Sequence, residues 1–180
     1  EPVVRSAMRQ AMKVMGHQFV MGRDIGSALK RADKGSNRDY RYSFDMLGEA
    51  ALTRADAQRY FDAYLSAIDA IGAAPSGENI FDSHSISVKL SALHPRYEFS
   101  RRQQAMEELA PLLLALTQRA RDVGIGLTMD AEEADRLELS LDIFAAVFSD
   151  ASLNDYEGLG LAVQAYQKRG LDVVRWLITL

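Results

Sequence analysis

Four short apolar segments alternate with longer amphipathic segments along the sequence, and this alternation limits the folds that the chain can adopt. The short segments span residues 42–47, 86–90, 125–129 and 161–165, with a loop rich in turn residues at 75–79. Alternating or β-branched apolar residues between turn signals are typical of β-strands. Between them, apolar residues spaced about one helical turn apart predict amphipathic helices. This order predicts an α/β fold with parallel strands.

A helical arm precedes the first predicted strand. Apolar residues about one turn apart predict a helix from residue 3, with a break at Gly16 and a second helical stretch that ends at Gly35. We therefore divide the chain into a helical arm, residues 1–39, and an α/β part, residues 40–180. In the α/β part, Thr53 and Asp56 form a capping-box-like start for the helix that follows the first strand.

One polar residue lies at or near the end of each predicted strand: Glu49, Lys89, Asp130 and Gln164. The carboxyl ends of the strands in a parallel barrel meet at one mouth, where these side chains could face one small ligand. An open dinucleotide-binding sheet would use the same ends, but no glycine-rich phosphate motif follows the first strand. We therefore expect a (βα)8 TIM-type barrel. Four units make half of such a barrel, so the other half must be supplied elsewhere.

Composition excludes several classes of function. The net charge of −4 provides no basic field for a polyanion, so we expect no nucleic-acid contact from this segment. The chain has no cysteine, which removes disulfides, thiolate metal sites and cysteine nucleophiles. His17, His84 and His94 lack the spacing of metal ligands, and we expect no metal. No membrane-spanning run or signal peptide is apparent, so the cytoplasm is the expected compartment.

Three of the candidate site residues also have a purely structural interpretation. Asp130 and Glu133, three residues apart, resemble a helix N-cap pair. Lys89 could form an internal ion pair with Asp130 or Glu49. Gln164 could be a core amide whose hydrogen bonds are satisfied. A structural role and a role in ligand binding are compatible for each of these residues. The residue patterns alone do not decide between them.

Four stretches of the sequence resemble the proline dehydrogenase domain of PutA-type enzymes. They are RYSFDMLGEAALT at residues 41–53, SVKLSALHPRY at 87–97, DAEEADRLE at 130–138 and QAYQKR at 164–169. The helical arm, with MGHQFV at residues 15–20, resembles the segment that leads into the barrel of the bifunctional enzymes. The resemblance covers nearly the whole chain and favours PutA over a monofunctional proline dehydrogenase.

The resemblance implies a barrel that binds FAD and oxidises L-proline to Δ1-pyrroline-5-carboxylate, the first step of proline catabolism. Hydride would pass to flavin N5, and electrons would then pass to a membrane quinone, which could place the protein at the periphery of the inner membrane. By the same resemblance, Lys89 contacts the substrate carboxylate, Asp130 lies at the amine end of the substrate, and Glu49 orients a cationic residue near the substrate. Gln164 and the backbone of Ala131 are implied to contact the flavin.

The resemblance also implies groups that these 180 residues do not contain. In the family, two arginines that bind the carboxylate and further FAD contacts come from later strands. We therefore expect the 180 residues alone to be inactive, and we expect the rest of the barrel and an aldehyde dehydrogenase domain as partners in the same parent chain. The alternatives are a monofunctional proline dehydrogenase with the same chemistry and a non-catalytic fragment of the fold that binds no flavin.

Overall fold

The computed structural model describes residues 2–46, 48–74 and 77–180. Leu47, the expected end of the first strand, and Pro75 and Ser76, in the predicted turn-rich loop, lie outside the described residues. The chain forms two compact units, Glu1–Tyr42 and Ser43–Leu180. Among the described residues, no helix is both long enough and apolar enough to cross a bilayer.

The first unit is helical. Helix α1 (Pro2–Phe19) runs without interruption through Gly16, and α2 (Ile25–Ala32) follows after a short connection. The predicted break at Gly16 is therefore wrong, because one glycine costs a helix only about 1 kcal/mol. The second helix begins instead at Asp24, whose carboxylate accepts a hydrogen bond from the Ser27 amide. It ends at Ala32, before the predicted stop, and a 3-10 helix, η1 (Gly35–Asp39), follows it.

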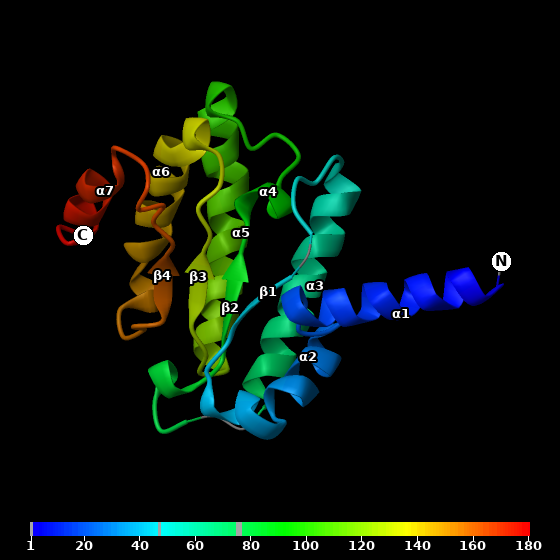
Figure 1. The fold of residues 1–180 in the computed structure, drawn as a ribbon. Helices are drawn as coiled ribbons and strands as arrows, with labels where there is room; N and C mark the ends of the chain where they lie inside the picture. The colour runs from blue at the N-terminus through cyan, green and yellow to red at the C-terminus, as the bar shows by residue number, and fades with distance from the viewer. Residues whose placement is uncertain (1, 47, 75–76) are drawn as a thin grey trace. The chain divides into compact units, whose positions relative to one another are not determined.

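The second unit contains a four-stranded parallel sheet in the order β1-β2-β3-β4 (Figure 1). Its strands are β1 (Ser43–Asp45), β2 (Ser85–Val88), β3 (Leu127–Met129) and β4 (Leu159–Leu161). All three neighbouring pairs are parallel, which confirms the predicted α/β class. Strand order follows chain order, as in consecutive units of a barrel.

The fourth strand begins two residues earlier than predicted and ends at Leu161 rather than at residue 165. The prediction treated Gly160 as a turn residue before the strand, but Gly160 lies within it, paired with Thr128. A Cβ at this position would lie 3.2 Å from the Thr128 hydroxyl oxygen, closer than most real Cβ contacts. Glycine therefore allows close approach of two strands here, and Gln164 is left in the loop beyond β4.

Helices cover one face of the sheet. Figure 1 shows α3 (Arg54–Gly72), α5 (Arg102–Asp122) and α6 (Leu137–Phe148) along this face. The remaining helical elements of the unit are α4 (Leu90–Leu93), α7 (Gly170–Leu177) and the 3-10 turns η2 (Ile80–Asp82), η3 (Phe99–Arg101), η4 (Ala134–Arg136) and η5 (Ala151–Leu153). The predicted cap of α3 is confirmed, since the Thr53 hydroxyl accepts a hydrogen bond from the Asp56 amide.

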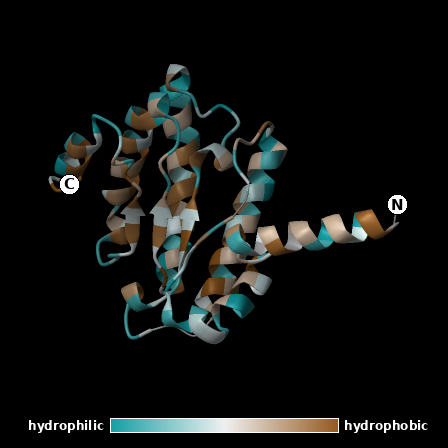
Figure 2. Cartoon of the chain, in the orientation of Figure 1, coloured by the Kyte–Doolittle hydropathy of each residue, from teal (hydrophilic) through white to brown (hydrophobic). Residues whose placement is uncertain are grey.

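The strands have one apolar and one polar face. A row of apolar residues that pair across the sheet, from Phe44 through Ile86 to Leu127, is buried. Because successive side chains alternate between faces, the paired residues Asp45, Ser87 and Thr128 occupy the opposite face. In Figure 2, the loop between β3 and α6 is largely hydrophilic.

The Glu108 carboxylate on α5 joins three segments of the helical layer. It accepts hydrogen bonds from Arg54 at the start of α3, from Gln104 one turn earlier in α5, and from the buried His94. The Arg96 amide donates to Nδ1 of His94, so the His94 proton lies on Nε2 and faces Glu108. The hydrogen bonds from Arg54, Gln104 and His94 lower the pKa of Glu108 to about 2.

This lowered pKa predicts a pH dependence of stability. A carboxyl group with a lowered pKa in the folded state stabilises the fold above its unfolded pKa, and this contribution is lost as the pH falls from about 4.5 to about 2. Glu108→Gln should therefore be less stable than wild type near pH 6, with a difference that shrinks towards pH 2. Urea unfolding across this range measures it. Glu107→Gln, at an adjacent exposed position, is the matched control for removing one carboxylate from α5. A stability difference for Glu108→Gln that stays constant with pH would refute the assignment.

Candidate active site

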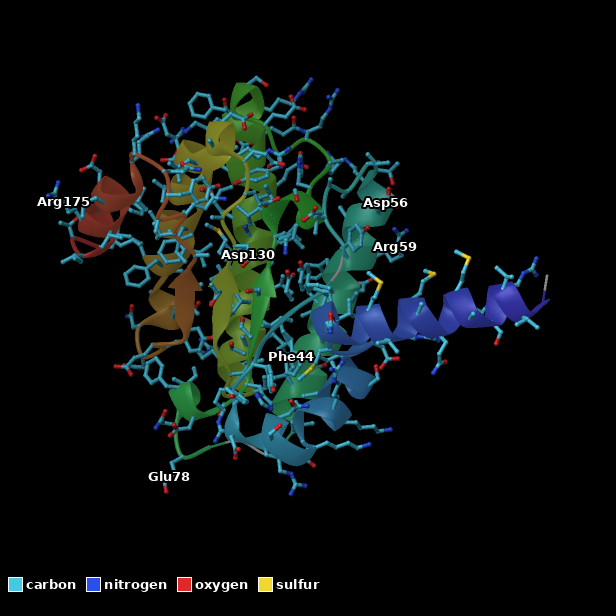
Figure 3. All side chains as sticks on the ribbon, viewed as in Figure 1. Phe44, Asp56, Arg59, Glu78, Asp130 and Arg175 are labelled. Atoms are coloured by element: carbon cyan, nitrogen blue, oxygen red, sulfur yellow. The ribbon has the colours of Figure 1, made fainter. Side chains whose placement is uncertain are left out.

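The ammonium group of Lys89 lies between two carboxylates from neighbouring strands. Its Nζ is 2.7 Å from both carboxylate oxygens of Asp45 and 2.9 Å from Oδ2 of Asp130. The Lys89 and Asp130 side chains are only 16% and 20% exposed, so water screens their contact weakly. Figure 3 shows Asp130 at the end of β3. Two anions and one cation therefore form a single cluster on the sheet.

The alternation of the strands explains why these three side chains meet. Lys89 comes directly after β2 and shares the face of Ser87, two residues earlier. Asp130 comes directly after β3 and shares the face of Thr128. Asp45 is the last residue of β1 and pairs with Ser87. All three therefore occupy the polar face at the carboxyl-terminal edge of the sheet.

Opposing effects act on the pKa of Lys89. Burial lowers this pKa, but hydrogen bonds and charge interactions with Asp45 and Asp130 outweigh burial, and the net effect raises it above its ordinary value. The Lys89 amide donates a hydrogen bond to the Tyr64 hydroxyl of α3, which is fully buried. Burial raises the pKa of Tyr64 to about 12, so this hydroxyl stays neutral. Lys89 is thus a cation at neutral pH, and its backbone is held by Tyr64.

A polar hollow of about 700 Å³ opens beside this cluster. Lys89, Glu49, Ala131 and Gln164, four of the five residues singled out in the sequence, line it. The fifth, Asp130, is not among the lining residues, but its carboxylate contacts Lys89, which is. Ser91, Glu132 and Arg136 are among the other lining residues. The structure therefore brings the strand-end residues together at one edge.

The four strand-end residues differ in how firmly they are held. Within residues 2–46, 48–74 and 77–180, Glu49 makes no ion pair, and its side chain is exposed. Gln164 lies in the loop after β4, and its side-chain oxygen accepts a hydrogen bond from the side-chain NH₂ group of Gln167. The NH₂ group of Gln164 is therefore the part that remains to contact a ligand. Lys89 and Asp130, in contrast, are fixed by each other.

The structural interpretations of these residues can now be compared with the observed contacts. The predicted N-cap role of Asp130 is wrong, because the next helical turn begins at Ala134 with Glu133 as its N-cap. The Asp130 amide instead extends the sheet ladder by donating to the Val88 carbonyl. The ion pair between Lys89 and Asp130 is confirmed. No pair between Lys89 and Glu49 is present among the described residues.

Sequence reasoning missed Asp45, Ser91 and Glu132. The sequence pattern could have identified Asp45, because it lies two residues after Ser43 on the polar side of an alternating strand. Lys89 lies two residues after Ser87 in the same way. The roles of Ser91 and Glu132 depend on loop geometry that no local pattern encodes. Among the described residues, no cluster of three or more metal-ligand side chains is present, although the His17 side chain lies outside this description. The absence of a metal remains a prediction.

Comparison with known proteins places these features in a family. Residues 28–180 match the family model described as proline dehydrogenase. The chain is 50% identical over its full length to the bifunctional protein PutA of Klebsiella aerogenes and 48% identical to that of Rhizobium meliloti, and it spans 14% of the length of each. It is 25% identical over 174 residues to proline dehydrogenase 1 of Bacillus subtilis subsp. natto, where it covers 51% of the relative.

Solved structures agree with the sequence comparison. A structure of Bradyrhizobium japonicum PutA is 55% identical with a TM-score of 0.83, covering 98% of this chain and 18% of that one. A Bdellovibrio bacteriovorus PutA structure has a TM-score of 0.87 over 98% of this chain and 20% of that one, but at 20% identity it supports the fold alone. The expected resemblance to PutA is therefore confirmed.

The charge cluster predicts a specific pattern of stability. Lys89→Met leaves Asp45 and Asp130 facing each other without their shared cation, which should lower the free energy of unfolding by about 1–3 kcal/mol. Adding Asp45→Asn removes one of the repelling charges and should restore part of this loss. Urea unfolding of both variants at neutral pH measures the effect, with Lys30→Met on exposed α2 as the matched control. A double variant no more stable than Lys89→Met would contradict the cluster.

Proposed function

The chain belongs to the proline dehydrogenase family, and we therefore propose that the protein containing it oxidises L-proline to Δ1-pyrroline-5-carboxylate with FAD as the electron acceptor. The observation that carries this proposal is the cluster of Lys89, Asp45 and Asp130 beside the polar hollow. Proline is a zwitterion, so a site for it needs a cation for the carboxylate and an anion near the amine. The cluster offers both charges within one hydrogen-bonded unit.

The residues of the polar hollow fit a flavin. Its volume of about 700 Å³ lies within the range of about 300–1,000 Å³ that is usual for small-molecule sites. The edge of an isoalloxazine ring carries carbonyl and N–H groups, which the Gln164 NH₂ group and the backbone of Ala131 can match. When bound, FAD would supply the hydride acceptor, flavin N5. Lys89 lines the hollow together with Ala131, and Asp130 is bonded to Lys89, so a small substrate in the hollow is proposed to contact both charged side chains.

In this proposal, Lys89 binds the carboxylate of proline. Hydrogen bonds and charge interactions with Asp45 and Asp130 raise the pKa of Lys89, which keeps its side chain positively charged at neutral pH. An ammonium donates three hydrogen bonds, and Asp45 and Asp130 occupy these in the structure. A substrate carboxylate must therefore replace or share one of these acceptors. Asp45, on β1, is proposed to keep its hydrogen bonds to Lys89 when substrate binds, and so to maintain the charge and the orientation of the ammonium group.

Asp130 is proposed to hold the amine end of the substrate. Its carboxylate stands directly after β3, one residue before Ala131, which we assign to the flavin. A substrate nitrogen held at Asp130 would keep the neighbouring ring carbon beside the flavin, and such orientation accelerates a reaction by limiting unproductive poses. Glu49, exposed and unpaired among the described residues, is proposed to orient a cationic group that this chain does not contain.

The wider setting is proposed from the PutA relatives. They are called bifunctional, and this chain spans 14% of their length, so the parent protein is proposed to hold the rest of the barrel and an aldehyde dehydrogenase domain. Electrons are proposed to pass from the flavin to a membrane quinone, with the protein in the cytoplasm and at the periphery of the inner membrane. The 25% identity to a protein named only proline dehydrogenase keeps the monofunctional enzyme as the second candidate.

Matched variants of the flavin-loaded parent protein test these roles by anaerobic stopped-flow reduction of the flavin with proline. Lys89→Met should raise the proline concentration for half-maximal reduction by about tenfold or more, because a charge-assisted hydrogen bond is lost. The limiting rate should change little. Asp130→Asn should instead lower the limiting rate by about tenfold or more, because the substrate nitrogen loses its orienting charge.

Asp45→Asn separates a direct role of Asp130 from one exerted through Lys89, since both aspartates contact the same ammonium group. If Asp130 acts on the substrate, Asp45→Asn should leave the limiting rate within about twofold of wild type. Equal losses in the two variants would show that Asp130 acts only by holding Lys89. A flavin in the wild-type protein that proline does not reduce would refute the proposed function as a whole.

A further inference from the structure

Ser91 connects the loops that follow the first three strands. Its hydroxyl oxygen accepts a hydrogen bond from the Ala50 amide at 3.2 Å, and its carbonyl accepts one from the Ala51 amide at 2.8 Å. Its own amide donates to Oε1 of Glu132 at 3.1 Å. Ser91 is only 4% exposed and lies in α4, two residues after Lys89. One residue therefore joins the loops after β1, β2 and β3.

The backbone at Ala50 is strained, so the hydrogen bond from the Ala50 amide to the Ser91 hydroxyl is needed to hold it. Ala50 has φ 54°, and no other non-glycine residue among those described has a positive φ. This left-handed conformation costs an alanine about 1 kcal/mol or more, so surrounding contacts must hold it. The Ser91 hydroxyl and carbonyl bind the amides on both sides of the Ala50 α-carbon. They can therefore hold the dihedral angles of Ala50.

The backbone conformation of Ala50 determines the position of Glu49, the residue before it. The φ of Ala50 sets the direction in which the preceding peptide and Glu49 leave the anchored segment. Glu49 lines the polar hollow, but its side chain is exposed and makes no ion pair with any described residue. Its place at the edge of the hollow is thus determined by its backbone. That backbone is tied to α4 through Ser91.

We propose that Ser91 is a positioning residue, which holds Glu49 at the edge of the polar hollow by bonding the strained backbone at Ala50. The inference rests on the proposed function, because it takes the hollow as the site where proline binds. Ser91 touches neither substrate nor flavin in this proposal and acts through Glu49. The Ser91 amide donates a hydrogen bond to Glu132 in the loop after β3, and this contact is separate from the proposed role of the hydroxyl.

Ser91→Ala isolates the hydroxyl, because it leaves the amide and carbonyl of residue 91 in place. Alanine is also a good helix former, so α4 should persist. The first measurement is amide hydrogen exchange in the flavin-loaded parent protein. The Ala50 amide should exchange about threefold to tenfold faster in Ser91→Ala, as expected for the loss of one neutral hydrogen bond. The amides of α3 should be unchanged. The Ala50 amide should also be unchanged in the control Ser83→Ala, which removes a buried hydroxyl that bonds the Asn79 carbonyl before β2 begins.

The second measurement is a double-mutant cycle on the proline dependence of flavin reduction. Ser91→Ala alone should raise KM for proline by about threefold to tenfold and leave kcat within about twofold. If Ser91 acts through Glu49, then Ser91→Ala in a Glu49→Gln background should raise KM no further. Ser91→Ala/Ala50→Asn should recover most of the lost KM, because asparagine adopts the left-handed conformation more readily than alanine.

Each outcome decides the proposal. Unchanged exchange at Ala50 in Ser91→Ala would overturn it, as would a KM effect that adds fully to that of Glu49→Gln. A loss of kcat with unchanged KM would assign Ser91 to a different task and reject the proposal as well. If proline fails to reduce the wild-type flavin, the proposed function fails, whereas the exchange at Ala50 still reports whether Ser91 holds this backbone.

Discussion

The ammonium group of Lys89, held between Asp45 and Asp130, is the interaction on which the arrangement of this edge depends. The three side chains come from three neighbouring strands, so their contact requires the parallel register of β1, β2 and β3. Without Lys89, the half-exposed carboxylate of Asp45 and the more buried carboxylate of Asp130 would repel each other. Without the carboxylates, a cation only 16% exposed would lose its partners. The cluster therefore links the order of the sheet to the charges available for a ligand.

The two faces of the sheet serve different purposes. The apolar row through Phe44, Ile86 and Leu127 is buried and holds the layers together. The polar row through Asp45, Ser87 and Thr128 buries no apolar side chains. Its groups form hydrogen bonds instead, such as that between the Ser43 and Ser87 hydroxyls. A polar sheet face is costly unless its groups are satisfied or face a polar ligand. This division is consistent with a flavin and a zwitterion at the carboxyl ends of the strands.

Much of this arrangement could be predicted from the sequence, because short-range patterns encode it. Alternating apolar residues located β1, β2 and β3, and the positions of Lys89 and Asp130 at strand ends followed from them. The predicted bounds of β4 were wrong because Gly160 looks like a turn residue in the sequence. In the structure it lies within the strand and allows close approach to Thr128. The break in the arm has a local cause instead: α1 tolerates Gly16, and the capping box of Asp24 and Ser27 starts the second helix. The bonds of Ser91 to Ala50, Ala51 and Glu132 cross about 41 residues of chain in each direction and leave no local trace.

The central claim is that the cluster of Lys89, Asp45 and Asp130 is the proline site of this family member. A crystal structure of the flavin-loaded parent protein with an unreactive carboxylate analogue of proline tests it most directly. The account predicts a ligand carboxylate within hydrogen-bonding distance of Lys89 Nζ, with the ring between Asp130 and the flavin. A ligand bound elsewhere, with Lys89 still bonded only to Asp45 and Asp130, would contradict it.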